Sequence, residues 1–168
     1  MANPYINHLY RTIFEEDFSN SASSKQIKMQ NAMYLLDEMG VNVGNYVYFL
    51  YDNGMFSGAL AMDMADIITE NDVILTNKVK CIVDELKKVL TVPANIGYTP
   101  AKWAACLGSL RHILKEAKGK GAEDEILIKL RVREPQLNDS AANKVALSCI
   151  NQLFCSHHIE SGCAFAHN

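Results

Sequence analysis

The sequence predicts a mainly α-helical protein: a single compact domain of about seven helices with a short strand or small β-hairpin. Apolar residues recur at helical spacing in about seven segments between residues 4 and 154. Residues 46–51 are aromatic and β-branched enough to form a short strand, and residues 73–75 are compatible with a brief extended segment. A chain of 168 residues can bury one core but is short for two substantial domains. We therefore expect residues 1–154 to form one helical domain, followed by a loosely ordered tail over residues 155–168.

The first three helices are predicted from their apolar stripes and end signals. A helix over residues 4–16 is followed by a small, polar loop, and Ser24 can cap a second helix over residues 25–39. Gly40 can end that helix in a left-handed conformation. Ser57 is a plausible cap for a third helix. The apolar face of this third helix consists of Leu60, Met64, Ile67 and Ile68.

Four further helices follow the same reasoning. Residues 79–90 give the best amphipathic pattern, and Thr99 and Pro100 supply an N-cap and a first helical residue for the fifth helix. The glycines and lysines of residues 118–121 end it, and Pro135 ends a short sixth helix. The seventh helix reaches Phe154, and its predicted cap is Asn138 or Asp139.

The strand over residues 46–51 is followed by a turn that begins at Asp52. It can pack in the core against the second and third helices, or it can offer a partner an exposed edge with tyrosine anchors, and the two roles are compatible. We expect the turn over residues 52–57 to lie at the surface beside the start of the third helix, with Phe56 anchoring it to the core. The predicted partner-binding residues are Tyr46, Tyr48, Tyr51, Asp52, Gly54, Phe56 and Ser57.

Composition and charge narrow the classes of partner. The formal net charge of −3 disfavours broad electrostatic binding to nucleic acid or to an anionic membrane, although a local basic patch is compatible with it. The first residues lack the pattern of a signal peptide, and no apolar run approaches the roughly 18 residues that span a bilayer. Five cysteines, an odd number, argue against a disulfide framework. These features favour a cytoplasmic protein.

The sequence contains no recognisable set of catalytic residues. A nucleophile needs a base within hydrogen-bonding reach, and none of the common hydrolase, protease, dinucleotide-binding or kinase motifs is present. Residues 118–121 lack the rest of a phosphate-binding loop, and His8 and His112 lie in helical patterns where structural or surface roles are typical. We therefore expect no catalytic residues and no cofactor.

The tail over residues 155–168 contains the ligand types that zinc prefers. Seven residues separate its two cysteines, which matches no common zinc motif, and a terminal segment of this composition is also typical of a loose tail. The candidate metal ligands are Cys155, His157, His158, Cys163 and His167.

Several segments together resemble one protein family. Residues 29–36, the strand over residues 46–51, the segment 54–57 and the helix over residues 60–68 look like the Panacea domain, also called the antitoxin SocA-like domain, and its uncharacterised bacterial and prophage relatives. Gln30, Tyr34, Leu35, Gly54, Phe56 and Ser57 fit the pattern, and residues 103–114 and 123–130 resemble its later helices. Two positions depart from it: Met55 replaces the usual proline, and Asn31 stands where a basic residue is common.

The resemblance implies a small, helical, non-enzymatic protein that binds another protein, such as a toxin or a component of a protease system. The leading hypothesis is thus a protein-binding module of the antitoxin or proteolysis-adaptor kind. The alternative is a DNA-binding transcriptional regulator with a winged-helix-like element, in which Lys25 and Lys28 start one helix. The charge balance argues against this alternative.

Overall fold

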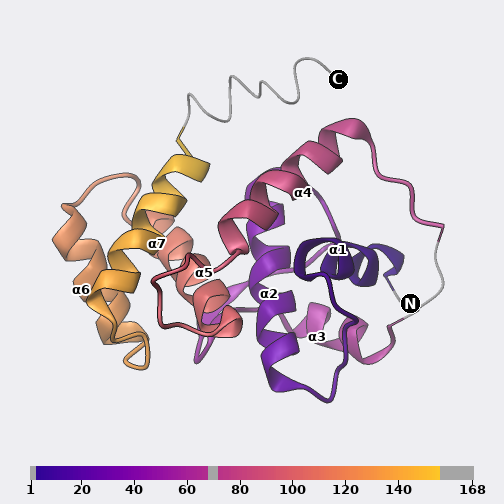
Figure 1. Cartoon of the computed structure of the whole chain (residues 1–168), viewed down its shortest axis with the longest axis horizontal. Coiled ribbons are helices and arrows are strands. Elements are labelled where there is room, and N and C mark those ends of the chain that lie inside the picture. The colour runs from indigo at the N-terminus through magenta and orange to yellow at the C-terminus, as the bar shows by residue number, and fades with distance from the viewer. Residues whose placement is uncertain (1–2, 68–71, 156–168) are drawn as a thin grey trace.

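The computed structural model describes residues 3–67 and 72–155, which form seven helices and one β-hairpin (Figure 1). The predicted fold class is confirmed. In chain order the elements are α1 (Pro4–Phe14), α2 (Ser23–Glu38), β1 (Phe49–Tyr51), β2 (Gly54–Phe56), α3 (Gly58–Ala65), α4 (Asn77–Leu90), α5 (Pro100–Glu116), α6 (Glu123–Arg133) and α7 (Ser140–Leu153).

Helices α2 and α5 pack against each other at the centre of the molecule. Helices α1, α3 and α4 contact α2, while α6, α7 and β2 contact α5 (Figure 1). Residues 28–36 of α2 are buried without a break, so this helix has no wide solvent-exposed face. Trp103 of α5 is fully buried, and its indole Nε1 donates a hydrogen bond to the Val89 carbonyl oxygen at 2.8 Å. Polar residues in the middle of α2 must therefore find partners inside the protein.

Most predicted helix ends are confirmed. The side chains of Ser57, Thr99 and Asp139 each accept a hydrogen bond from a backbone N–H in the first turn of the helix that follows. Gly40 follows α2 with a φ of +92°. The prediction for Ser24 is wrong, because α2 begins at Ser23 and no side chain caps it.

The strand and the third helix are shorter than predicted. Tyr46, Val47 and Tyr48 are not part of β1, because β2 offers a pairing partner over three residues only before Ser57 starts α3. Helix α3 ends at Ala65, so Ile67 lies beyond it, and Ile68 lies outside the described residues.

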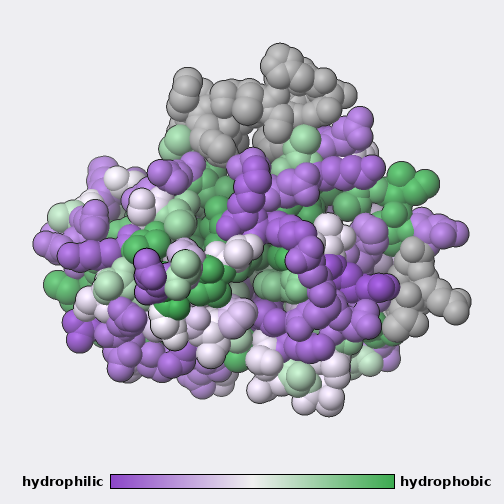
Figure 2. Space-filling view, in the orientation of Figure 1, coloured by the Kyte–Doolittle hydropathy of each residue, from purple (hydrophilic) through white to green (hydrophobic). Residues whose placement is uncertain are grey.

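Over the face drawn in Figure 2, hydrophobic residues lie in small groups between hydrophilic ones. None of the helices within residues 3–67 and 72–155 combines the length and the apolar character needed to cross a bilayer. Residues 156–168 are outside the description, so the loosely ordered tail stays a prediction.

Candidate functional site

Two amide side chains of α2 hold the inner strand of the hairpin. The Asn31 Oδ1 accepts a hydrogen bond from the Met55 N–H at 2.9 Å, and its Nδ2 donates to the carbonyl oxygens of Asn53 (3.1 Å) and Ile27 (2.9 Å). The Gln30 side chain accepts from the Ser57 N–H at 2.8 Å and donates to the Ser57 carbonyl oxygen at 3.0 Å. Both amides are buried, and they satisfy hairpin backbone groups much as a neighbouring strand would.

A buried carboxyl group holds the turn from the other side. The Glu134 Oε1 accepts hydrogen bonds from the Gly54 N–H at 2.9 Å and from the Ser109 hydroxyl at 3.4 Å. The Gln136 Nε2 donates to the Glu134 Oε2 at 2.5 Å and to the Asp52 carbonyl oxygen at 2.6 Å. Burial raises the pKa of Glu134, although these hydrogen bonds act in the opposite direction. We call Gln30, Asn31, Ser109, Glu134 and Gln136 the polar anchor.

Two glycines allow the backbone to approach the polar anchor. Gly54 has a φ of +83°, and a Cβ there would lie 2.4 Å from the Asn31 Oδ1 and 2.9 Å from the Ala105 Cα. A Cβ at Gly108 would lie 2.2 Å from the same Asn31 oxygen. A side chain at either position would overlap with groups that hold the hairpin.

The two departures from the Panacea pattern contact each other. Met55 has a backbone N–H that a proline would lack, and that N–H donates to the side chain of Asn31. Asn31 is fully buried and Met55 nearly so. Both residues therefore make their contacts inside the protein and are not exposed to a partner.

The opposite face of the hairpin is exposed and apolar. Exposure alternates along residues 46–51, with Val47 at 79%, Phe49 at 50% and Tyr51 at 61%. The half-buried Phe56 lies between the two aromatic rings, with ring centroids 5.9 Å from Phe49 and 6.0 Å from Tyr51. In the described sheet β1 pairs with β2 alone, so its other edge is open. We call Val47, Phe49, Tyr51 and Phe56 the outer hairpin face.

The structure separates the predicted partner-binding residues into two groups. Tyr51 and Asp52 are exposed, and Phe56 lies on the outer hairpin face, where it contacts Phe49 and Tyr51 and does not anchor the turn. Met55 is the residue of the turn that reaches the core. The prediction that the whole turn lies at the surface is wrong for Gly54 and Ser57, which are buried because the polar anchor binds their backbone groups.

Tyr46 and Tyr48 pack inward and line a pocket that sequence reasoning missed. The Tyr46 hydroxyl donates to the Asp63 Oδ2 at 2.6 Å and accepts from the Asn3 Nδ2 at 2.8 Å. The hydroxyls of Tyr34 and Tyr48 are buried and have no hydrogen-bond partner among the described residues, at a cost of about 1–3 kcal/mol each. The tyrosine pocket, a cavity of about 330 Å³, is lined by Tyr34, Asp37, Glu38, Tyr46, Tyr48, His112, Lys115 and Glu116.

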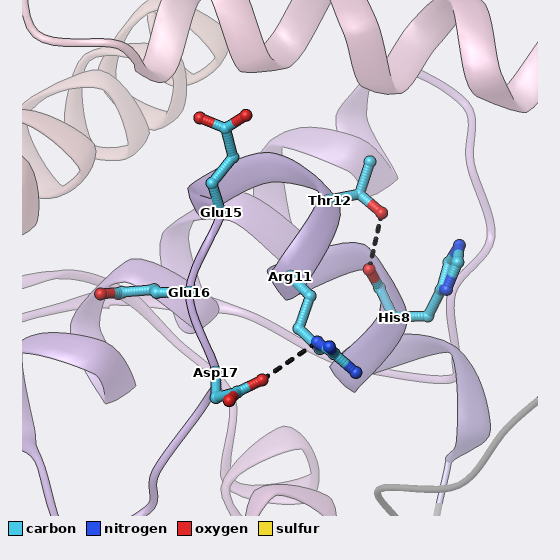
Figure 3. A pocket seen from close by; sticks show the side chains of 6 residues that line it. All are labelled: His8, Arg11, Thr12, Glu15, Glu16 and Asp17. Atoms are coloured by element: carbon cyan, nitrogen blue, oxygen red, sulfur yellow. Dashed lines mark hydrogen bonds and ion pairs between the residues drawn. The ribbon is translucent and has the colours of Figure 1, made fainter.

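A second depression, of about 540 Å³, lies at the end of α1 (Figure 3). Its charged groups are already paired: the Arg11 Nε lies 3.1 Å from the Asp17 Oδ1, and Glu15 pairs with Lys87 at 3.1 Å. Glu16 accepts hydrogen bonds from Lys28 and Tyr10. These bonds outweigh the opposing effect of burial and lower the pKa of Glu16. The residues that line this depression are His8, Arg11, Thr12, Glu15, Glu16 and Asp17.

These pairings also bear on the DNA-binding alternative. Lys28 is buried, and its Nζ lies 5.1 Å from the centre of the Phe14 ring in addition to its bond to Glu16. The Lys25 Nζ donates to the Asp17 carbonyl oxygen at 2.5 Å. The two lysines at the start of the helix that would contact DNA in this alternative thus already bind groups within the protein.

Burial shifts the pKa values of two further titratable groups outside the polar anchor. Burial raises the pKa of the Cys106 thiol and lowers that of His112, whose Nε2 lies 3.4 Å from Glu116. Within residues 3–67 and 72–155, no three His, Cys, Asp or Glu side chains are grouped to hold a metal ion. Of the predicted metal ligands, Cys155 is exposed, and the others, His157, His158, Cys163 and His167, lie outside the described residues.

No family model, curated protein or solved structure matches this chain. The resemblance to the Panacea domain therefore stays a prediction.

Proposed function

We propose that this protein is a non-catalytic protein-binding module of the antitoxin or proteolysis-adaptor kind, and that it binds its partner through the outer hairpin face. The exposed row of Val47, Phe49 and Tyr51 is the observation that carries the proposal. Large apolar side chains that stay exposed in a contiguous group favour an interaction surface. Aromatic residues are also common among those that dominate binding energy.

The backbone of the hairpin supports the same proposal. The open edge of β1 leaves strand hydrogen-bonding groups that an extended segment of a partner can pair with, which is the β-augmentation mode. The polar anchor fixes the other strand from inside the protein. A surface held in place before binding loses less conformational entropy when the partner arrives.

The class of partner follows from the sequence resemblance. A toxin or a component of a protease system is the partner that the Panacea domain implies. A cytoplasmic location belongs to the same proposal.

A comparative pull-down tests the role of the outer hairpin face. The wild type and the double variant Val47→Asp/Tyr51→Asp are used as bait in extracts of the cells that express this chain. Met62→Asp, on α3, is the control, because Met62 is also a large exposed apolar residue, at 76%. A captured protein is then purified and its Kd measured against all three baits.

We expect the partner to bind the wild type and the Met62→Asp variant, and the double variant to bind at least 10-fold more weakly. Equal Kd values for all three baits would remove the outer hairpin face from the site. The antitoxin version has its own test, because a toxic protein encoded next to this chain must lose its toxicity when the two are co-expressed. Failure to rescue growth would exclude that version.

A further inference from the structure

The tyrosine pocket lies where the C-terminal end of α2 meets α5 and the segment before β1. Asp37 and Glu38 occupy the last turn of α2, which contains no basic residue. Backbone carbonyls give a helix C-terminus a partial negative charge, so two carboxylates there add to a field of the same sign. The helix end, Asp37 and Glu38 thus all contribute negative charge to this end of the pocket.

The carboxylates of the pocket differ in how well they are compensated. Glu38 pairs with the Arg111 Nε at 3.0 Å and with the Lys115 Nζ at 2.9 Å. Glu116 pairs with Arg133. Asp37 forms no ion pair with another described residue. Partial burial and then the charge of Glu38 raise its pKa, while the charge of Lys115 acts in the opposite direction. A cation beside Asp37 would relieve this repulsion.

The buried phenol groups point to a missing ligand. The Tyr34 side chain is 4% exposed, and its hydroxyl has no hydrogen-bond partner in the described structure. Tyr34 lines the pocket together with Asp37 and Glu38, and the centre of its ring lies 5.3 Å from that of Tyr48. Burial and then the charge of Glu38 raise the pKa of Tyr34, while the charge of Arg111 acts in the opposite direction. Burial and then the charge of Asp37 raise the pKa of the Tyr48 hydroxyl in the same way.

We propose that the tyrosine pocket binds an organic cation, an alkylammonium or a guanidinium group, which pairs with Asp37 and hydrogen-bonds to the hydroxyls of Tyr34 and Tyr48. Tyrosine rings attract cations through the negative charge of their faces. An anion would instead meet the carboxylates of Asp37, Glu38 and Glu116. The proposal does not depend on the function of the outer hairpin face.

Lys115 is the side chain that a ligand would displace. Its side chain is 59% exposed, and its ammonium group already occupies one oxygen of Glu38 at the pocket. The Lys115 end of this pair is exposed to solvent, where holding a long side chain in one place costs entropy, so an incoming cation can compete with it.

The experiment is a calorimetric titration of the full chain at low salt with agmatine, which has an ammonium and a guanidinium group. The uncharged 1,4-butanediol is the probe control. The variants are Asp37→Asn, Tyr34→Phe and Lys115→Met, with Asp84→Asn as the matched control, because Asp84 is an exposed carboxylate on α4 outside the pocket.

We expect saturable binding of agmatine and none of butanediol. Asp37→Asn should weaken binding at least 10-fold, Asp84→Asn less than 2-fold, and Lys115→Met should strengthen it severalfold. Tyr34→Phe should weaken binding about 5-fold while raising the Tm of the free protein, because it removes an unpaired buried hydroxyl. A purely structural tyrosine would raise the Tm without changing the affinity.

A capped Gly-Arg-Gly peptide distinguishes the two sources of such a cation. Binding as tight as that of agmatine assigns the pocket to an arginine side chain of a partner, and binding of agmatine alone assigns it to a small amine. No saturable binding of either probe, or equal affinity of the wild type and Asp37→Asn, would overturn the proposal.

Discussion

The two strands of the hairpin differ in burial and in their contacts with the rest of the protein. Strand β2 is mostly buried, and polar side chains from α2 and from the segment after α6 bind its backbone. Strand β1 is exposed, and it displays aromatic rings to solvent. Polar groups thus lie inside and apolar groups outside, the reverse of the usual distribution. The difference indicates that β2 fixes the position of the hairpin, and β1 is the strand that we propose for binding.

The polar anchor is costly to disturb because its side chains hydrogen-bond to groups inside the protein. The Asn31 side chain accepts one hydrogen bond and donates two inside the protein. The Glu134 carboxylate accepts hydrogen bonds from three groups. Removing one member leaves the buried groups that it binds without a partner, which costs more than the net value of the lost hydrogen bond. Substitutions on the two sides of the hairpin should therefore differ sharply in their effect on stability.

The largest expected effect is that of Gly54→Ala, with Gly40→Ala as its matched control. Both glycines have positive φ, but a Cβ at Gly40 meets no atom within 4 Å, whereas one at Gly54 overlaps with Asn31 and with the backbone of Ala105. We expect Gly40→Ala to lower the free energy of unfolding by about 1 kcal/mol, and Gly54→Ala to lower it by about 4 kcal/mol. Urea denaturation measures both, and equal losses would show that the close approach is not a constraint.

Asn31→Ala is expected to have the second largest effect. It leaves the Met55 N–H and the Asn53 carbonyl without their partner and opens space in the core, so we expect a loss of about 3 kcal/mol in the free energy of unfolding. Asn45→Ala, at an exposed position, should change it by less than about 0.5 kcal/mol. Chemical denaturation compares the two variants, and a loss below 1 kcal/mol for Asn31→Ala would contradict the role given to the polar anchor.

Glu134→Gln should change how stability depends on pH. The pKa of Glu134 is raised in the folded protein, so from about 4.5 upward the unfolded chain gives up this proton before the folded protein does. Its contribution to stability therefore falls as the pH rises through that window, and the loss is complete above the folded pKa. The free energy of unfolding of the wild type, minus that of Glu134→Gln, should fall between pH 4 and pH 7, and urea denaturation at each pH measures it.

The difference between the two proteins isolates Glu134, because Glu16, whose pKa is lowered, has the opposite dependence on pH in both. A difference that stays constant over this pH range, or rises with pH, would show that the pKa of Glu134 is not raised.

The smallest effect on stability is expected on the outer hairpin face. The Tyr51 side chain is largely exposed and forms no hydrogen bond with another described residue. Tyr51→Ser should therefore change the free energy of unfolding by less than about 0.5 kcal/mol. Thermal denaturation tests this expectation. A loss above 1.5 kcal/mol would mean that the outer hairpin face supports the fold itself.

Local patterns in the sequence predict most of the helices, because periodicity and caps such as Thr99 and Asp139 are local signals. The polar anchor could not be predicted in this way, since the bond between Gly54 and Glu134 joins residues 80 positions apart. Alternation along the strand could have separated Tyr51 from Tyr46 and Tyr48, because neighbouring strand residues face opposite sides. The exposure of Val47 and Phe49 follows from the same rule.

The most direct test of the central claim is to measure folding and partner binding in the same variant, Val47→Asp/Tyr51→Asp. With a purified partner, we expect its Kd to rise at least 10-fold while the free energy of unfolding stays within about 1 kcal/mol of the wild type. An unchanged Kd in a folded variant would contradict the assignment of binding to the outer hairpin face. A rise in Kd that is matched by unfolding would contradict the separation of the two strands into a structural one and a binding one.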